Sequence, residues 1–597
     1  MIVQARKSYK VVTEKNVPMK TRDGVTLMAD VVRPDRPGRF PVLLSRTPYN
    51  KKGTDDPNGP TYLFASHGYI SITQDCRGRF QSEGEYDTIF QEVADGYDAV
   101  EWAARLPWSN GRVGTTGQSY LGLTQYLIAC NDPMPPSLQV MAPVSASSDY
   151  HASWIYHTGG AAMWGWMAPY AIFKGLNTLK RAGRADLLEK VKEYVEGAEF
   201  PIMRQTPWGL NAFTPLTNEW YRHLPIKDWG ALLKETAPYF AEHIKNADDG
   251  EYWYRANVNR HAASVTVPML HVTSWYDIFG EGGPSAYRSI KANSRFAKAR
   301  NGQRLIIGPW GHLLPYNVPS SRGTGDIDFG PTALIDLNET LLRWFDYWLK
   351  DIDSGIMDEP PVTVFTLGTN RWQDLADWPP PKMRNVPYFL HGAEGANSLR
   401  GDGTLSTVPP GGEPVDQYVY DPMDPVPSLG GNNLTIDMGV QDQRSVEARN
   451  DVLVYTSEAL EQPLEITGPV SVTLWAASSA VDTDFTAKLI DVRPDGYAMN
   501  LADGMIRARY RESASAPRLM EASQPYRFTI DLWATSNVFL PGHRIRLEIS
   551  SSNFPHFDAN LNTGEAFGEG TKGIPARQTV FHQDDMASHL LLPVIPR

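Results

Sequence analysis

The sequence predicts three parts: a mostly parallel α/β sheet, a helical insertion within it, and a C-terminal all-β sandwich. Up to residue 147, and again over 255–353, short apolar runs alternate with helical patterns, which is typical of a parallel sheet covered on both faces. Between these parts, residues 148–254 follow helical patterns and are rich in aromatic residues. Over 354–597, proline and glycine separate short alternating runs, as in a sandwich of antiparallel strands.

Length and composition restrict the class of protein. A chain of 597 residues is too long for one core, so two or three domains are expected. The formal net charge of −12 argues against nucleic acid or an anionic membrane surface as partners. Cys76 and Cys130 are too few for a disulfide framework and have no metal-ligand spacing. No apolar stretch has the length of a signal peptide or a membrane span, so we expect a cytoplasmic protein.

The first part of the sheet opens with a hairpin. Residues 10–20 and 25–32 alternate as strands do, and Asp23-Gly24 between them predicts a tight turn. The elements expected next are strands at 41–45 and 69–73, a helix at 92–105 with one apolar stripe, and a strand at 138–142.

The insertion and the second part of the sheet follow. Within 148–254, the clearest helical pattern covers 184–197. The elements that resume the sheet are strands at 267–273 and 304–308, and a closing helix at 334–349.

The C-terminal part contains short strands such as 470–475, 526–533 and 543–550. In the last of these, Ile545, Leu547 and Ile549 face one way, whereas Arg544, Arg546 and Glu548 face the other. This alternation predicts a half-buried antiparallel strand.

The stretch Gly114–Gly122 predicts the catalytic centre. Ser119 stands between glycines, where a short strand passes into an apolar helix, and this arrangement is typical of a nucleophile elbow. The turn would hold the serine hydroxyl above the sheet, beside backbone N–H groups that can receive an oxyanion. One departure is that Leu121 occupies the position where the usual motif has its second glycine, and Gly122 follows it.

A serine nucleophile needs an imidazole to take its proton and a carboxylate to orient that imidazole. Asp277 follows the strand at 267–273, and His312 follows the strand at 304–308. Both are therefore expected at the carboxyl edge of the sheet, in the chain order serine, acid, histidine. Other residues with acid or base chemistry remain open as alternatives: His271, His157 and Asp75.

Taken together, the motifs resemble those of the CocE/NonD family of serine hydrolases, which groups cocaine esterase with the X-prolyl dipeptidyl-peptidases. The resemblance covers almost the whole chain, and in that family the shifted second glycine of the elbow is the rule. The motifs that carry it are Arg46-Thr47-Pro48-Tyr49, Asp75-Cys76-Arg77-Gly78, Ser82-Glu83-Gly84, Gly117–Gly122, Trp275-Tyr276-Asp277, Gly308–His312 and Ser552–Asp558. It implies an α/β-hydrolase core, a helical cap and a C-terminal jelly-roll.

The resemblance also implies roles for individual residues. Ser119 would be the nucleophile, Asp277 the acid and His312 the base, and the oxyanion hole would be formed by the Tyr120 backbone N–H and the Tyr49 phenol. A phenol O–H can donate to a developing alkoxide in this way. The implied walls of the substrate pocket are Trp154, Trp166 and Phe279. Arg77 and Glu83 are interpreted as structural.

Relatives that cleave α-amino esters hold the substrate ammonium with a cluster of acidic residues. Two of the positions concerned are Phe279 and Gly280 in this chain. An α-amino ester is therefore not the favoured substrate, and an X-prolyl peptide, whose free amine needs the same kind of anchor, is favoured less for that reason.

We therefore interpret the chain as a serine carboxylesterase that acts on a small-molecule ester and requires no metal or organic cofactor. Its expected parts are a core over 1–147 and 255–353, a cap over 148–254 and a jelly-roll sandwich over 354–597. Two alternatives stay open: an amidase, acylase or X-prolyl dipeptidyl-peptidase with the same triad, and a non-catalytic sugar- or polymer-binding protein. The substrate and the oligomeric state, including a homo-oligomer, are left undetermined.

Overall fold

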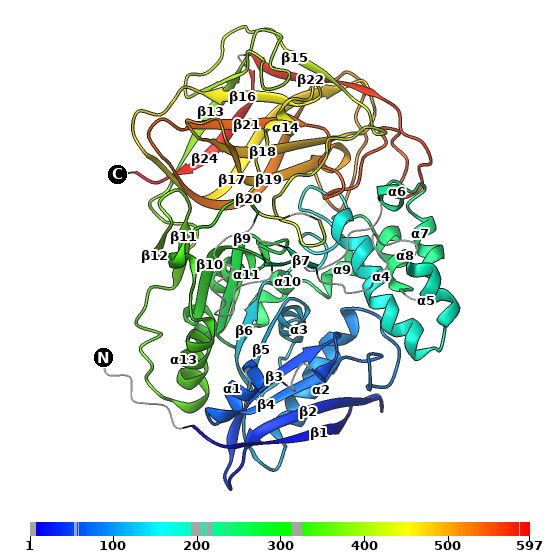
Figure 1. Cartoon of the computed structure of the whole chain (residues 1–597), viewed down its shortest axis with the longest axis vertical. Coiled ribbons are helices and arrows are strands. Elements are labelled where there is room, and N and C mark those ends of the chain that lie inside the picture. The colour runs from blue at the N-terminus through cyan, green and yellow to red at the C-terminus, as the bar shows by residue number, and fades with distance from the viewer. Residues whose placement is uncertain are drawn as a thin grey trace.

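The computed structural model describes residues 8–52, 56–57, 59–192, 204–206, 209–211, 218–235, 237–312, 325–436, 438–583 and 585–596. Figure 1 shows an α/β region in the lower half, a group of helices at its side, and an all-β region above both.

A ten-stranded, mostly parallel sheet forms the core, and this confirms the sheet type that the sequence predicts. Its strands are β1 (Val11–Lys20), β2 (Thr26–Pro34), β3 (Phe40–Thr47), β4 (Ile70–Asp75), β5 (Ser109–Gln118), β6 (Leu138–Val144), β9 (Met269–Tyr276), β10 (Gln303–Gly311), β11 (Val362–Thr366) and β12 (Arg371–Leu375). They are ordered β1-β2-β4-β3-β5-β6-β9-β10-β11-β12. All neighbouring pairs from β4 to β11 are parallel, whereas the pairs at the two edges are antiparallel.

The two ends of this sheet concern the predicted hairpin and the expected domain boundary at residue 354. The predicted hairpin is present as the antiparallel pair β1–β2, with Gly24 at φ 90° in its turn. At the other end, β11 pairs with β10 and β12 pairs with β11. The expected boundary at residue 354 thus precedes two strands of the core sheet, since β11 pairs with β10 and β12 extends the sheet from β11.

Helices cover both faces of the sheet. On one face, apolar residues of α2 (Phe90–Ala104), α3 (Tyr120–Ala129) and α11 (Gly282–Asn293) pack against the strands. On the other face, α1 (Pro60–Ser66) and α13 (Leu337–Lys350) do the same. Because neither face of the sheet is wet, residues on both sides of its central strands are buried, and all eight residues of β9 are.

The segment between β6 and β9 is mainly helical. Its elements are α4 (Trp164–Arg181), α5 (Ala185–Lys192), the strand pair β7 (Arg204–Thr206) and β8 (Gly209–Asn211), α6 (Asn218–Tyr221), α7 (Asp228–Leu232), α8 (Tyr239–Lys245), α9 (Glu251–Tyr254) and α10 (Val258–His261). The predicted helix at 184–197 corresponds to α5, and its last residues, 193–197, lie outside the described residues. No helix in the described part of the chain is both long enough and apolar enough to cross a bilayer.

The C-terminal part is an all-β domain. Its strands are β13 (Arg384–His391), β14 (Thr404–Ser406), β15 (Asp416–Tyr420), β16 (Leu453–Ser457), β17 (Leu464–Ser478), β18 (Asp484–Val492), β19 (Ala498–Arg507), β20 (Tyr526–Phe539), β21 (Arg544–Ser550), β22 (Ala576–Gln583), β23 (Met586–Ala587) and β24 (His589–Val594). They form one hydrogen-bonded network of twelve strands.

The expectation of a half-buried strand at 543–550 is wrong. In β21, Ile545, Leu547 and Ile549 lie in the core as predicted, but Arg546 and Glu548 are also buried, at 8% and 3% exposure. The polar face of the strand is covered, and its charges are paired there: Arg546 Nη1 lies 2.7 Å from a carboxylate oxygen of Glu447. Alternation along a strand identifies its two faces, but it does not reveal whether another segment of the chain covers the polar one.

Candidate active site

Ser119 lies in the tight turn between β5 and α3. Its backbone adopts φ 61° and ψ −126°, a conformation that non-glycine residues rarely hold unless the surroundings enforce it. Gly117, at φ 142°, and Gly122 make the turn possible. A Cβ at 117 would stand 2.4 Å from the Cβ of Leu121, and one at 122 would stand 2.8 Å from the carbonyl oxygen of Val144. The chain therefore needs its second glycine at 122.

Three side chains from separate strand ends meet above this turn. Ser119 Oγ lies 2.8 Å from His312 Nε2, and His312 Nδ1 lies 2.9 Å from Asp277 Oδ1. Asp277 directly follows β9, and His312 directly follows β10. Since β5, β9 and β10 are parallel members of one sheet, their carboxyl ends lie at the same edge, and this brings the three groups together.

The imidazole and the carboxylate are held firmly and away from water. Asp277 is fully buried, and its Oδ1 also accepts a hydrogen bond of 2.8 Å from the backbone N–H of Phe279. Within the described part of the chain, its Oδ2 has no hydrogen-bond partner. Gln118 Nε2 donates to the carbonyl oxygen of His312 at 2.5 Å. With a proton on Nδ1 facing Asp277, the Nε2 of His312 is free to accept the serine proton.

The structure does not bring the other candidate acids and bases to this point. His271 is buried in β9, where its Nδ1 lies 2.7 Å from the Tyr126 hydroxyl. Burial lowers the pKa of His157 to about 3, so it stays neutral. Asp75 accepts a hydrogen bond of 2.8 Å from the backbone N–H of Lys51. The contacts of His271 and Asp75 are internal to the fold, and all three side chains are buried.

Two further groups border the serine hydroxyl. The Tyr49 hydroxyl lies 3.3 Å from the Tyr170 hydroxyl, and Ser119 is close enough to influence the pKa of the Tyr49 phenol. Burial raises the pKa of Tyr49 to about 12, so its O–H remains a donor at ordinary pH. Tyr120 begins α3, and the first N–H groups of a helix have no partner within that helix. Its own phenol points away from the serine and donates to Glu92 at 3.3 Å.

Aromatic rings line the region beside the imidazole. Trp154 and Phe279 are stacked, with centroids 4.2 Å apart, and Trp166 meets the Phe279 ring edge-on at 5.4 Å. Phe279 in turn packs edge-on against His312, at 5.1 Å. At the next position, a Cβ on Gly280 would stand 3.0 Å from the carbonyl oxygen of Asp277, so any side chain there would crowd the backbone.

Some residues of this cluster were not predicted from the sequence. Tyr170 and Lys174, one turn apart on α4, border Tyr49. Their i, i+4 spacing predicts a common helix face, but it does not predict what that face contacts. Apolar residues of the C-terminal domain also join the same cluster: Leu434, Met438, Met505, Phe554 and Phe557. The two phenylalanines belong to the Ser552–Asp558 motif, whereas no local pattern indicates the other three.

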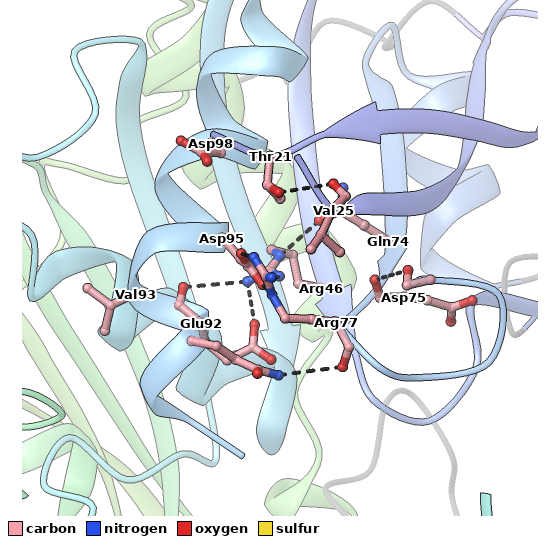
Figure 2. Close-up of polar contacts among 12 residues, drawn as sticks. Thr21, Val25, Arg46, Gln74, Asp75, Arg77, Glu92, Val93, Asp95 and Asp98 are labelled. Carbon is pink, nitrogen blue, oxygen red and sulfur yellow. Dashed lines mark hydrogen bonds and ion pairs between the residues drawn. The ribbon is translucent and has the colours of Figure 1, made fainter. Parts of the chain in front are cut away.

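A buried network of charges connects the elements that carry Tyr49 and Tyr120. Figure 2 shows Arg46, at the end of β3, among Gln74, Glu92 and Asp95. Arg46 Nη1 forms an ion pair with Glu92, and both side chains are almost inaccessible, at 1% and 0% exposure. The same Glu92 accepts the hydrogen bond from the Tyr120 phenol. The network thus joins the strand that leads to Tyr49 with the helix that follows Ser119.

Known proteins similar to this chain are hydrolases. The model of the X-Pro dipeptidyl-peptidase (S15) family matches residues 23–314, and that of the X-Pro dipeptidyl-peptidase C-terminal non-catalytic domain matches residues 354–591. Cocaine esterase of Rhodococcus sp. (strain MB1 Bresler) is 38% identical, over 99% of this chain and 99% of its own. An aminopeptidase structure from a marine sediment archaeon, Thaumarchaeota archaeon, has 25% identity and a TM-score of 0.79, covering 99% of this chain and 97% of that one. An α-amino acid ester hydrolase structure has 26% identity and a TM-score of 0.77, covering 100% and 98%.

The close packing at Gly122 predicts that Gly122→Ala destabilises the core by about 1–3 kcal/mol, because the added methyl group overpacks against backbone. Thermal unfolding measures this change. The matched control is Gly412→Ala, where a Cβ meets nothing within 4 Å, and its effect should stay within about 0.5 kcal/mol. Equal melting temperatures for both variants would contradict the packing argument.

The Arg46–Glu92 pair predicts a second stability effect. Glu92→Gln should destabilise the protein by about 3–5 kcal/mol, because it leaves the Arg46 charge buried without its main partner. Urea unfolding measures the loss. Arg22→Ala, which removes an ion pair with Asp98 in which Arg22 is half exposed, should change the free energy of unfolding by no more than about 1 kcal/mol. A Glu92→Gln variant that unfolds at the wild-type urea concentration would count against this role of the pair.

Proposed function

We propose, because the chain belongs to the CocE/NonD family of serine hydrolases that includes cocaine esterase and the X-Pro dipeptidyl-peptidases, that Ser119 is its nucleophile, His312 its general base and Asp277 the residue that orients the base. The enzyme is an ester-cleaving serine hydrolase. The observation that carries the assignment of these residues is the unbroken chain of contacts, 2.8 Å and 2.9 Å, from the serine oxygen through the imidazole to the carboxylate.

In the proposed reaction, Ser119 Oγ attacks the ester carbonyl carbon while His312 Nε2 takes the serine proton. The resulting oxyanion accepts hydrogen bonds from the Tyr49 phenol and the Tyr120 backbone N–H. His312 then gives its proton to the departing alcohol, which leaves an acyl group on Ser119. Water, activated by the same imidazole, attacks this acyl group and releases the acid. Apart from the ester and the attacking water, every step uses groups of the chain itself, so the proposal requires no metal or organic cofactor.

The finer architecture belongs to the same proposal. We assign residues 148–254 as a cap over the site, because Trp154 and Trp166 of this segment pack against Phe279 beside the imidazole. The core comprises 1–147 and 255–353 together with β11 and β12. The remainder of 354–597 is assigned as a jelly-roll sandwich, supported by its antiparallel strands and the separately matched C-terminal family model.

The lining of the site favours small esters with an apolar acyl or alcohol group. Trp154, Trp166 and Phe279 offer ring faces, and the two positions where α-amino ester relatives have acids are Phe279 and the closely packed Gly280. An ammonium group would lose its hydration there without gaining a carboxylate at either position.

We also propose a cytoplasmic location. Both cysteines, Cys76 and Cys130, are buried free thiols, which suits a reducing compartment.

Amide hydrolysis, as an acylase or an X-prolyl dipeptidyl-peptidase, is the second candidate function. It is favoured by the S15 family match and by the similarity to an aminopeptidase structure. Such activity uses the same triad, but it needs an anchor for a free amine when the substrate is a peptide.

Replacing the nucleophile is the first test. Ser119→Ala should lower kcat for ester hydrolysis by about 10⁴- to 10⁶-fold and abolish labelling by a fluorophosphonate probe, with an unchanged melting temperature. Ser515→Ala, at an exposed serine of the C-terminal domain, should keep both the activity and the label. A clean Ser119→Ala preparation that still turns over would overturn the assignment. A wild-type protein that takes no label would favour a non-catalytic binding protein.

Matched substrates separate the two enzymatic candidates. An ester and an anilide with the same neutral acyl group should differ at least about 100-fold in kcat/KM in favour of the ester, and adding an α-amino group to the acyl part should lower the ester rate. Faster cleavage of an X-prolyl anilide than of the neutral ester would instead establish the peptidase.

A further inference from the structure

A buried lysine amine lies against Tyr49, and the catalytic steps above do not use it. Lys174, on α4, has 0% exposure. A lysine with a buried stem usually keeps its amine in water, but this one does not. Within the described part of the chain, its Nζ has no hydrogen-bond acceptor. An apolar side chain of the same length would fill this space without burying an amine, so the amine is costly where it stands.

Aromatic rings surround this amine. Lys174 Nζ lies 3.6 Å from the centroid of the Tyr49 ring, within the range at which an amine interacts with a ring face. Among the described residues, three further ring centroids lie within 6 Å of the amine: those of Tyr170 at 5.0 Å, Tyr120 at 5.1 Å and Phe173 at 5.4 Å. Phe173 also stacks on the Tyr49 ring, with an interplanar angle of 20° and centroids 5.9 Å apart. The N–H bonds of the amine therefore have ring faces as their partners.

Arg79 ties the lysine and the tyrosine together through the backbone. Its Nε donates to the carbonyl oxygen of Pro48, the residue before Tyr49, at 3.1 Å. Its Nη1 donates to the carbonyl oxygen of Lys174 at 2.9 Å. A single buried guanidinium thus fixes the distance between the loop that carries Tyr49 and the turn of α4 that carries the amine.

The charged and titratable groups that face the amine come from several elements. Burial lowers the pKa of Lys174 well below that of an ordinary lysine, and the charge of Arg79 lowers it further, whereas Cys76 and Glu92 act in the opposite direction. The remaining titratable groups around it are the phenols of Tyr49, Tyr120 and Tyr170.

We propose that Lys174 is a positioning residue for the oxyanion step: its amine, packed on the ring face of Tyr49, orients that phenol and strengthens it as a hydrogen-bond donor. The inference rests on the proposed function, in which Tyr49 donates to the oxyanion. N–H bonds directed at a ring withdraw electron density from it, and this makes the phenol O–H a better donor. The effect matters most in the transition state, where negative charge develops next to the Tyr49 oxygen.

The test is Lys174→Met, which keeps the length of the side chain and removes the amine. Ester hydrolysis should show kcat lowered by about 10- to 100-fold, with KM changed less than about twofold, since substrate binding does not involve the amine. The melting temperature should not fall. The matched control is Lys180→Met, at an exposed lysine of the same helix, and it should behave as wild type. Should Lys174→Met fold poorly, Lys174→Gln replaces it, with the same loss of kcat expected.

A double-mutant cycle with Tyr49→Phe shows whether the lysine acts through the phenol. Tyr49→Phe alone should lower kcat by about 10²- to 10³-fold. Adding Lys174→Met to it should then change kcat by less than about twofold, because the donor that the amine tunes is already gone. The inference is overturned if Lys174→Met keeps wild-type kcat, or if it lowers kcat equally with and without the Tyr49 hydroxyl. Fluorophosphonate labelling of Ser119 in every variant separates this outcome from failure of the proposed function, which would appear as an unlabelled wild type.

Discussion

The strained backbone at Ser119 is the constraint on which the site depends. A residue with a side chain is held at positive φ between β5 and α3, and this lifts its hydroxyl above the sheet edge. The strained conformation persists because the turn is packed tightly on both sides. Gly117 and Gly122 lie too close to their neighbours to carry a side chain. The imidazole and the carboxylate then need only to follow β10 and β9, two parallel strands of the same sheet, to come within hydrogen-bonding reach.

Buried charged side chains link the elements that carry the groups of the site. Arg46 and Glu92 link the strand before Tyr49 to the phenol of Tyr120, and Arg79 links Pro48 to Lys174 on α4. Paired charges of this kind contribute little to stability compared with apolar packing, but they tolerate few alternative arrangements. Their position around the proposed oxyanion donors suits a site in which a donor displaced by one ångström loses much of its effect.

The C-terminal domain completes the aromatic region instead of standing apart from it. Asp558 exchanges two hydrogen bonds with Ala162, one of 2.7 Å through its carboxylate and one of 3.0 Å through its backbone N–H. The backbone N–H of Arg507 donates to the carbonyl oxygen of Gly159 at 2.9 Å. These contacts hold the loop between Trp154 and Trp166, so the C-terminal domain helps to position the aromatic rings beside His312.

The sequence alone determined the sheet type, the elbow at Ser119 and the positions of Asp277 and His312, because each of these depends on local patterns: glycines around a turn, apolar runs of strand length, and polar residues directly after them. Only the tertiary structure decided the rest. The pairing of β11 and β12 with the core, the covered polar face of β21, and the placement of Tyr170 and Lys174 against Tyr49 all depend on segments far apart in the chain. A residue type and its spacing indicate which face of an element is apolar or reactive, but burial and donor strength are properties of whatever packs against that face, and no local pattern specifies that partner.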